Sequence, residues 1–162
     1  MPGVGIVAGV AGSNRGFWKV VIPLIVAGIV LFVLVLAFRP VARTGAVAFA
    51  QANLRRAADA AETVATADGS LADATRERLK AEGSVDDLLL IDPDESSNDP
   101  EVVSVMATEA AWTGSVRAET GECFWIRLRA GSGSGFGTVR GTGTNCSAEE
   151  ASAATPGAWP KP

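Results

Sequence analysis

The two cysteines are the first residues of this chain with chemistry to consider, because paired thiols form disulfides, bind metals or carry out redox steps. Cys123 and Cys146 stand 23 positions apart, and no C-x-x-C motif of the redox or zinc-binding type is present. In a small chain that is tethered to a membrane, as predicted below, the pair favours one disulfide formed in an oxidising compartment. Two free thiols in a cytosolic domain are the alternative.

The other residue types that carry out catalysis are poorly represented. The 162 residues include no histidine, which removes the commonest general base and the commonest metal ligand. A Ser-His-Asp or Cys-His site is therefore excluded within the chain. The Gly-rich segment 131–135 is not a phosphate-binding loop, because neither a Lys-Ser/Thr pair nor a predicted helix follows it. We expect a protein that is not an enzyme, with no catalytic residue and no cofactor.

An acidic loop over residues 92–100 is the candidate metal site. The carboxylates of Asp92, Asp94 and Asp99 are hard oxygen ligands of the kind that Ca²⁺ accepts. The loop lacks the ligand order and the glycine of an EF-hand. These three residues are therefore weak candidates, and a solvated loop without a bound metal is the favoured interpretation.

An uncharged apolar run over residues 20–38 precedes all of these residues and is bracketed by Lys19 and Arg39. As a helix, its 19 residues would extend about 28 Å, close to the ~30 Å hydrocarbon layer of a membrane. We therefore predict a transmembrane helix over 17–39, in preference to a cleaved signal peptide or a buried core helix. A disordered cytoplasmic leader over 1–16 would precede it.

The charge distribution separates this N-terminal part from the rest of the chain. Lysine and arginine total 14 and aspartate and glutamate total 18, so the net charge is −4. Residues 1–39 hold three basic residues and no acidic one, and the remainder therefore carries 11 − 18 = −7. This balance does not favour a nucleic-acid partner, whereas membrane lipid would contact the apolar run. Charge alone leaves the orientation open, and the cysteines favour an extracytoplasmic C-terminal domain.

Residues 40–153 are predicted to form an α+β domain, followed by a flexible tail over 154–162. Over 43–67 the apolar residues recur at gaps of three and four, which is typical of an amphipathic helix. This apolar stripe consists of Val47, Ala50, Leu54, Ala57, Ala61 and Val64. Beyond the acidic loop, four segments have the composition of antiparallel strands. They are 101–107, 112–119, 122–130 and 136–140.

The predicted strand 122–130 alternates between two kinds of side chain, as a half-buried strand does. One face, predicted to pack on the helix, holds Phe124, Ile126 and Leu128. The other face, predicted to be exposed, holds Trp125, Arg127 and Arg129. Trp125 is a candidate contact for a partner protein, or else the C-terminal tail covers it.

Several segments in this order resemble bacterial type IV pilins and pseudopilins over residues 46–153. They are the Ala-Gln-Ala-Asn-Leu-Arg of 50–55, the strand 115–127 with its Gly-Glu-Cys-Phe-Trp-Ile, and the Asn-Cys-Ser-Ala of 145–148. The resemblance implies a long N-terminal transmembrane and amphipathic helix packed on a small antiparallel sheet of about four strands. It also implies a structural role, with other pilins or pilus-assembly proteins as partners.

The N-terminal signature of this family is partly present. Arg15-Gly16-Phe17 is similar to a prepilin cleavage site, which makes Gly16 and Phe17 the candidate cut. Val21 occupies the position of the family's glutamate, and Pro23 departs from the pattern. The resemblance therefore implies a minor pilin-like or pseudopilin component of a type IV pilus or related secretion assembly. The alternative is an unrelated extracytoplasmic binding domain on a single membrane anchor.

Overall fold

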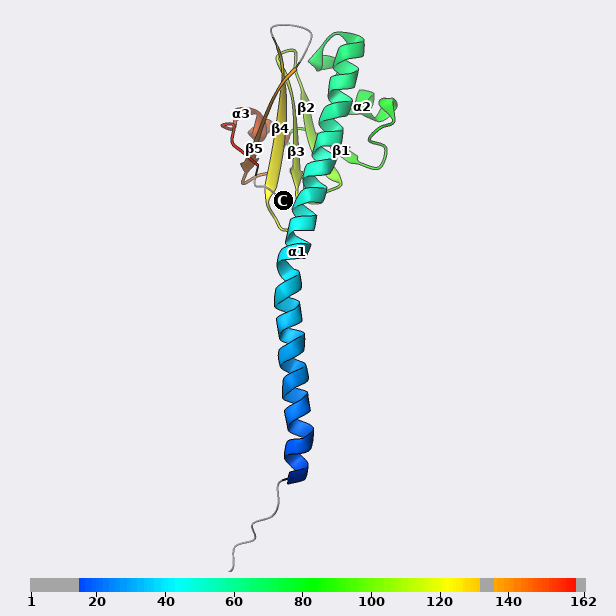
Figure 1. Ribbon diagram of the computed structural model, residues 1–162. Coiled ribbons are helices and arrows are strands. Elements are labelled where there is room, and N and C mark those ends of the chain that lie inside the picture. The colour runs from blue at the N-terminus through cyan, green and yellow to red at the C-terminus, as the bar shows by residue number, and fades with distance from the viewer. Residues whose placement is uncertain (1–14, 132–135, 160–162) are drawn as a thin grey trace, which may run out of the picture. The chain divides into compact units, whose positions relative to one another are not determined.

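The computed structural model describes residues 15–131 and 136–159, without the side chains of 15–20, 35–36 and 38–42. The chain divides into two compact units, Met1–Pro40 and Val41–Pro162. The second unit, called the C-terminal domain below, holds every described strand (Figure 1).

Helix α1 runs over Arg15–Asp68 and is 54 residues long. No helix among the described residues is long and apolar enough to cross a membrane. The predicted transmembrane helix over 17–39 is therefore wrong, and so is the single-pass membrane location with an extracytoplasmic domain that was built on it.

The sheet has five strands in the order β1-β2-β3-β4-β5. Strands β2 to β5 are antiparallel neighbours, as predicted, whereas β1 pairs with β2 in parallel. The strands are β1 Leu89–Ile91, β2 Val102–Ala107, β3 Ala111–Arg117, β4 Cys123–Ala130 and β5 Phe136–Gly143. The protein is thus α+β, but its sheet is mixed, and the predicted antiparallel sheet of four strands is wrong.

Strand β1 was not predicted, because Leu89, Leu90 and Ile91 are all apolar and show no alternation of apolar and polar residues. Leu90 is buried in the core, while Leu89 is 54% exposed. A run of three similar residues carries no period, so only its pairing with Val102 and the residues that follow identifies it as a strand.

The core lies between the C-terminal part of α1 and one face of the sheet. The whole predicted stripe, from Val47 to Val64, is buried, and so are Phe124, Ile126 and Leu128. Small alanines allow the helix to approach the sheet closely, and Gly114 serves the same purpose on β3. A Cβ at that position would lie 3.0 Å from Leu54 Cδ1 and 2.6 Å from the Trp112 ring.

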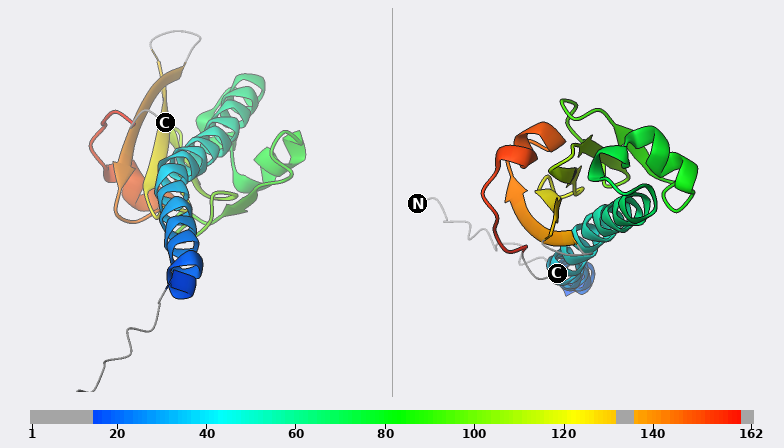
Figure 2. Two further views of the ribbon diagram at one scale, coloured as in Figure 1. Left: turned by 60° about the horizontal axis from the view of Figure 1, so that its bottom comes forward. Right: turned by 90° about the horizontal axis from the view of Figure 1, so that it is seen from above.

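Short helices complete the C-terminal domain. The 3₁₀ turn η1 (Leu71–Asp73) and α2 (Arg76–Glu82) follow α1, and Thr75 caps the start of α2 by accepting the N–H of Arg78. Helix α3 (Ala148–Ala153) packs on β3 and β4. The strands lie between α3 and the C-terminal part of α1 (Figure 2). The sheet of this domain is therefore covered on both faces.

Candidate functional site

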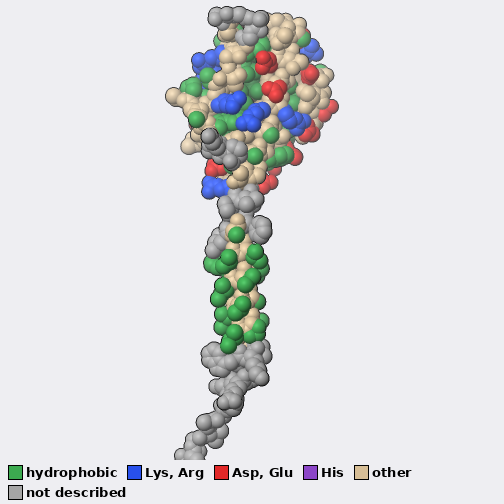
Figure 3. Space-filling model, viewed as in Figure 1, with side chains coloured by type: hydrophobic (Ala, Val, Ile, Leu, Met, Phe, Trp, Pro, Cys, Tyr) green, Lys and Arg blue, Asp and Glu red, His purple; other side chains and the backbone are tan. Residues whose placement is uncertain are grey.

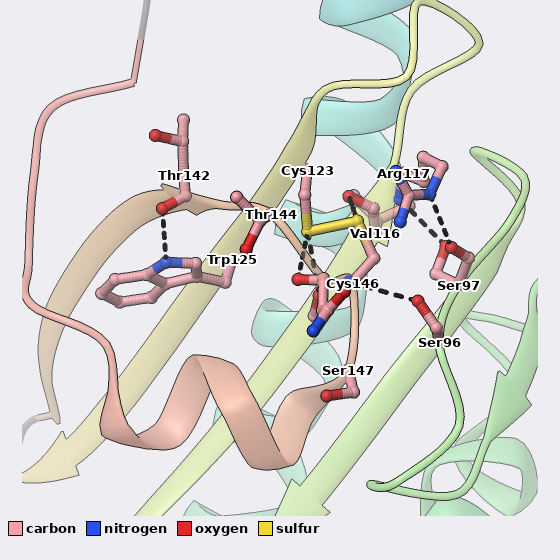
Figure 4. Close-up of a disulfide and its surroundings, with 12 residues drawn as sticks. Ser96, Ser97, Val116, Arg117, Cys123, Trp125, Thr142, Thr144, Cys146 and Ser147 are labelled. Atoms are coloured by element: carbon pink, nitrogen blue, oxygen red, sulfur yellow. Dashed lines mark hydrogen bonds between the residues drawn. A yellow bond between two sulfur atoms is a disulfide. The ribbon is translucent and has the colours of Figure 1, made fainter.

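Cys123 and Cys146 are joined by a disulfide, as the sequence predicts, with their Cα atoms 5.4 Å apart. Both residues are buried. The bond ties the start of β4 to the residue that precedes the N-cap of α3 (Figure 4). The Cys146 carbonyl accepts the Ser97 N–H at 2.9 Å, and the Cys146 N–H donates to Ser96 Oγ at 3.2 Å. The disulfide therefore fixes α3 and the acidic loop to the sheet.

The acidic loop is held by protein groups rather than arranged around a cation. Asp92 pairs with the Arg76 guanidinium at 2.9 Å, and the Asp99 carboxylate accepts the Glu101 N–H at 2.9 Å. Within the part of the chain that is described, no three His, Cys, Asp or Glu side chains gather as a metal site would require. Asp92, Asp94 and Asp99 therefore do not form a ligand set there.

Trp125 is 1% exposed and does not present the surface that a partner contact would need. Its ring lies against Gly141 of the neighbouring strand, where a Cβ would come within 2.3 Å of Trp125 Cζ2. The indole N–H donates to the Thr142 carbonyl at 3.4 Å, as Figure 4 shows. Glycine at position 141 thus provides the space that this ring occupies.

Arg127 is also buried, at 5% exposed, although the alternation of β4 predicts an exposed face. Its Nη2 donates to the carbonyls of Ala151 and Ala154 at the end of α3, where a cation interacts favourably with the helix dipole. Burial lowers the pKa of the guanidinium. The alternation itself is correct, but α3 covers the second face, and a strand pattern does not show what packs upon it.

Trp159 holds the C-terminal segment against the domain. The described part of the predicted flexible tail, residues 154–159, therefore has a defined position. The Gly157 N–H donates to the Arg140 carbonyl at 2.7 Å, which lays the tail along β5. The Trp159 indole N–H donates to the Gly141 carbonyl at 3.0 Å, and the ring stands edge-on to Phe124 with centroids 5.9 Å apart. The only sequence signal for this contact is an isolated tryptophan near the chain end.

Two arginines flank the Trp159 ring. The guanidinium carbons of Arg55, on α1, and Arg140, on β5, each lie 5.2 Å from its centroid, which is a cation–π distance. Both side chains are exposed. No carboxylate among the described residues comes within salt-bridge distance of either arginine. We call Arg55, Trp159 and Arg140 the basic cluster, in which two exposed arginines flank a partly buried aromatic ring.

A second exposed surface lies on α1 in the first unit. Its large apolar side chains over residues 22–34, called the apolar segment below, are 47–67% exposed. Figure 3 shows hydrophobic side chains along this stretch of the helix. A continuous apolar surface of this kind is typical of an interaction site. The candidate cleavage residues Gly16 and Phe17 lie in the first turn of α1, but their side chains fall outside the described ones, as do residues 1–14.

Comparison with known proteins found no match. No protein-family model, no curated protein and no solved structure matches this chain. Function therefore has to be argued from the two exposed surfaces and the residues of the chain itself.

Surface ion pairs predict how stability depends on pH. The Arg56 guanidinium holds the pKa of Asp87 below its ordinary value of 3.8, and Arg78 does the same for Asp68. A folded-state pKa below the unfolded one adds stability above the unfolded pKa and loses it as the pH falls through the folded value. With no histidine to titrate, the melting temperature should stay constant from pH 7 to about 5.5 and fall below about pH 4. Calorimetry across this range tests the profile, and a loss between pH 7 and 5.5 would contradict it.

Proposed function

We propose that the protein is a structural subunit, a minor pilin-like or pseudopilin component of a type IV pilus or related secretion assembly. In this role the apolar segment of α1 packs against the corresponding helices of other subunits. The chain then acts by association, and its C-terminal domain is the folded body that the assembly displays.

The exposed apolar segment is the observation that carries the proposal. Leu24 and Leu31 are 67% and 65% exposed, and they lie seven positions apart, on one face of α1. Transfer of a leucine side chain from water to a packed interface is favourable by about 1.5–3 kcal/mol. A water-exposed segment with this composition is therefore stabilised by packing against similar helices.

The C-terminal domain supplies further support. The same helix continues into this domain, where its Ala-rich stripe packs on the sheet, and the disulfide closes the segment between β4 and α3. These features agree with the resemblance that residues 46–153 bear to pilins. The buried Trp125 and Arg127 have structural roles, and the described residues offer no metal set.

The proposal predicts that Leu24→Gln/Leu31→Gln strongly weakens self-association of the full chain. Glutamine is a good helix former, so the change removes apolar area while α1 stays helical. The loss of about 3–6 kcal/mol per contact weakens association at least about 100-fold. Sedimentation velocity at increasing protein concentration measures this change.

Leu89→Gln is the matched control, because Leu89 is 54% exposed on β1 in the C-terminal domain. This variant should associate as the wild type does, and circular dichroism should report equal helix content in all three proteins. A wild-type chain that stays monomeric at all concentrations, or a double variant that associates like the control, would overturn the proposed function.

A further inference from the structure

Charged side chains of opposite sign follow one another along the exposed side of α1 in the C-terminal domain. Arg55, Asp59 and Glu62 are spaced by four and three residues, which places them on one face of the helix. All three are exposed. Figure 3 shows acidic and basic side chains lying beside one another on the face of the domain that it presents.

Among the described residues, no ion pair neutralises the charges on this face. Among the described residues, neither Arg55 nor Arg140 pairs with a carboxylate, and neither Asp59 nor Glu62 pairs with a cation. The neighbouring Arg56 differs, because it binds Asp87 at 2.6 Å. Stacking on Trp159 holds Arg55 in place even though Asp59 stands four positions away on the same helix.

The basic cluster is organised in advance for an acidic partner. The Trp159 ring is fixed by its hydrogen bond to the Gly141 carbonyl and by its edge contact with Phe124. Arg55 and Arg140 stand at equal distances of 5.2 Å from this ring. Side chains that are already positioned lose less conformational entropy on binding a carboxylate than free ones do.

Asp59 and Glu62 lie in a hollow of the protein surface. Asp59 and Glu62 line a shallow hollow on α1 together with Thr63, Thr66 and Ala67. The two threonine hydroxyls donate to carbonyls of α1, Thr63 to Asp59 and Thr66 to Glu62, at 2.9 and 2.7 Å. Neither donation uses a carboxylate, so the Asp59 and Glu62 side chains remain able to accept hydrogen bonds from a guanidinium.

We propose that the basic cluster of one copy binds Asp59 and Glu62 of a second copy in the assembly. Arg55 lies four to seven residues from these acids, which is about 6–10 Å along the helix. A parallel neighbour displaced by that distance sets its acids opposite the basic cluster. The contact also offsets the repulsion between chains that each carry a net charge of −4.

Charge exchange in the full chain tests this contact. Arg55→Glu/Arg140→Glu leaves like charges facing each other, and so does Asp59→Arg/Glu62→Arg. Each variant should associate at least about tenfold more weakly than the wild type. Mixing the two variants, or combining all four substitutions in one chain, should restore association. The fourfold variant lacks both arginines that stack on Trp159. If it associates again, the cause is therefore the restored charge complementarity between copies and not the native basic cluster.

The matched control is Lys80→Glu/Arg129→Glu, which lowers the net charge by the same amount as Arg55→Glu/Arg140→Glu does, at two exposed residues that form no ion pair among those described. It should associate more strongly than the two charge-reversed variants. Equal weakening in the control would overturn the proposal in favour of a net-charge effect. Loss without restoration on mixing would overturn it in favour of a contact between the basic cluster and other residues of the second copy.

This inference rests on the proposed function, and the two fail differently. A wild-type chain that never associates contradicts the proposed function. A wild-type chain that associates through the apolar segment, while the charge-reversed variants associate equally well, contradicts only the contact between the basic cluster and Asp59 and Glu62.

Discussion

Replacement of Trp125 by alanine is expected to lower the free energy of unfolding by about 3–5 kcal/mol. The ring is 1% exposed and fills the space over Gly141, so its loss leaves a cavity that the strands cannot collapse to fill. Urea denaturation measures the change. We would use the Leu24→Gln/Leu31→Gln background, in which self-association does not contribute to the measured stability.

Arg129→Ala is the control for this experiment, since Arg129 alternates with Trp125 on the same face of β4 but is exposed. Its replacement should change the free energy of unfolding by less than about 0.5 kcal/mol. Equal effects at the two positions would show that α3 and the tail do not cover the second face of the sheet.

Removal of the disulfide by Cys123→Ala/Cys146→Ala is expected to cost about 3 kcal/mol. The two cysteines are separated by 23 positions, and cross-linking a loop of that length reduces the entropy of the unfolded chain by about this amount. Position 146 also anchors the N-terminal end of α3 and the Ser96–Ser97 segment, so local protection of these backbone amides should fall as well. Thermal denaturation and amide hydrogen exchange measure the two effects.

Reduction of the wild type provides the comparison for the double variant. A reducing agent should lower the stability of the wild type by a similar amount and leave that of the variant unchanged. Thiol labelling of the unreduced, unfolded wild type should detect no free cysteine. Two labelled thiols per chain would show that Cys123 and Cys146 are not joined, and would remove the basis of the stability prediction.

Local periodicity predicted the parts of the fold in which one face is apolar and the other is polar. The stripe from Val47 to Val64 is buried as predicted, and Phe124, Ile126 and Leu128 meet it from β4. The pairing of Cys123 with Cys146 was also predictable, because the described chain holds no other cysteine with which either could pair.

The transmembrane prediction used the apolar composition of 20–38, whereas the described structure contains no helix long and apolar enough to cross a membrane. Other features depend on contacts that are distant in sequence. The basic cluster brings together Arg55, Arg140 and Trp159 from a helix, a strand and the tail. No spacing rule relates positions that far apart, so the sequence contains no direct signal for this surface.

The sequence by itself determined which residues form the amphipathic part of α1, the inner face of β4 and the disulfide. These follow from side-chain periodicity and thiol chemistry, both of which are local properties. Only the tertiary structure decided whether the other face of β4 is buried or exposed. Trp125 and Arg127 on that face are buried because α3 and the C-terminal tail pack over it. The physical reason is that alternation assigns side chains to the two faces of a strand, whereas burial depends on which segments, distant in sequence, bury apolar surface by packing on each face.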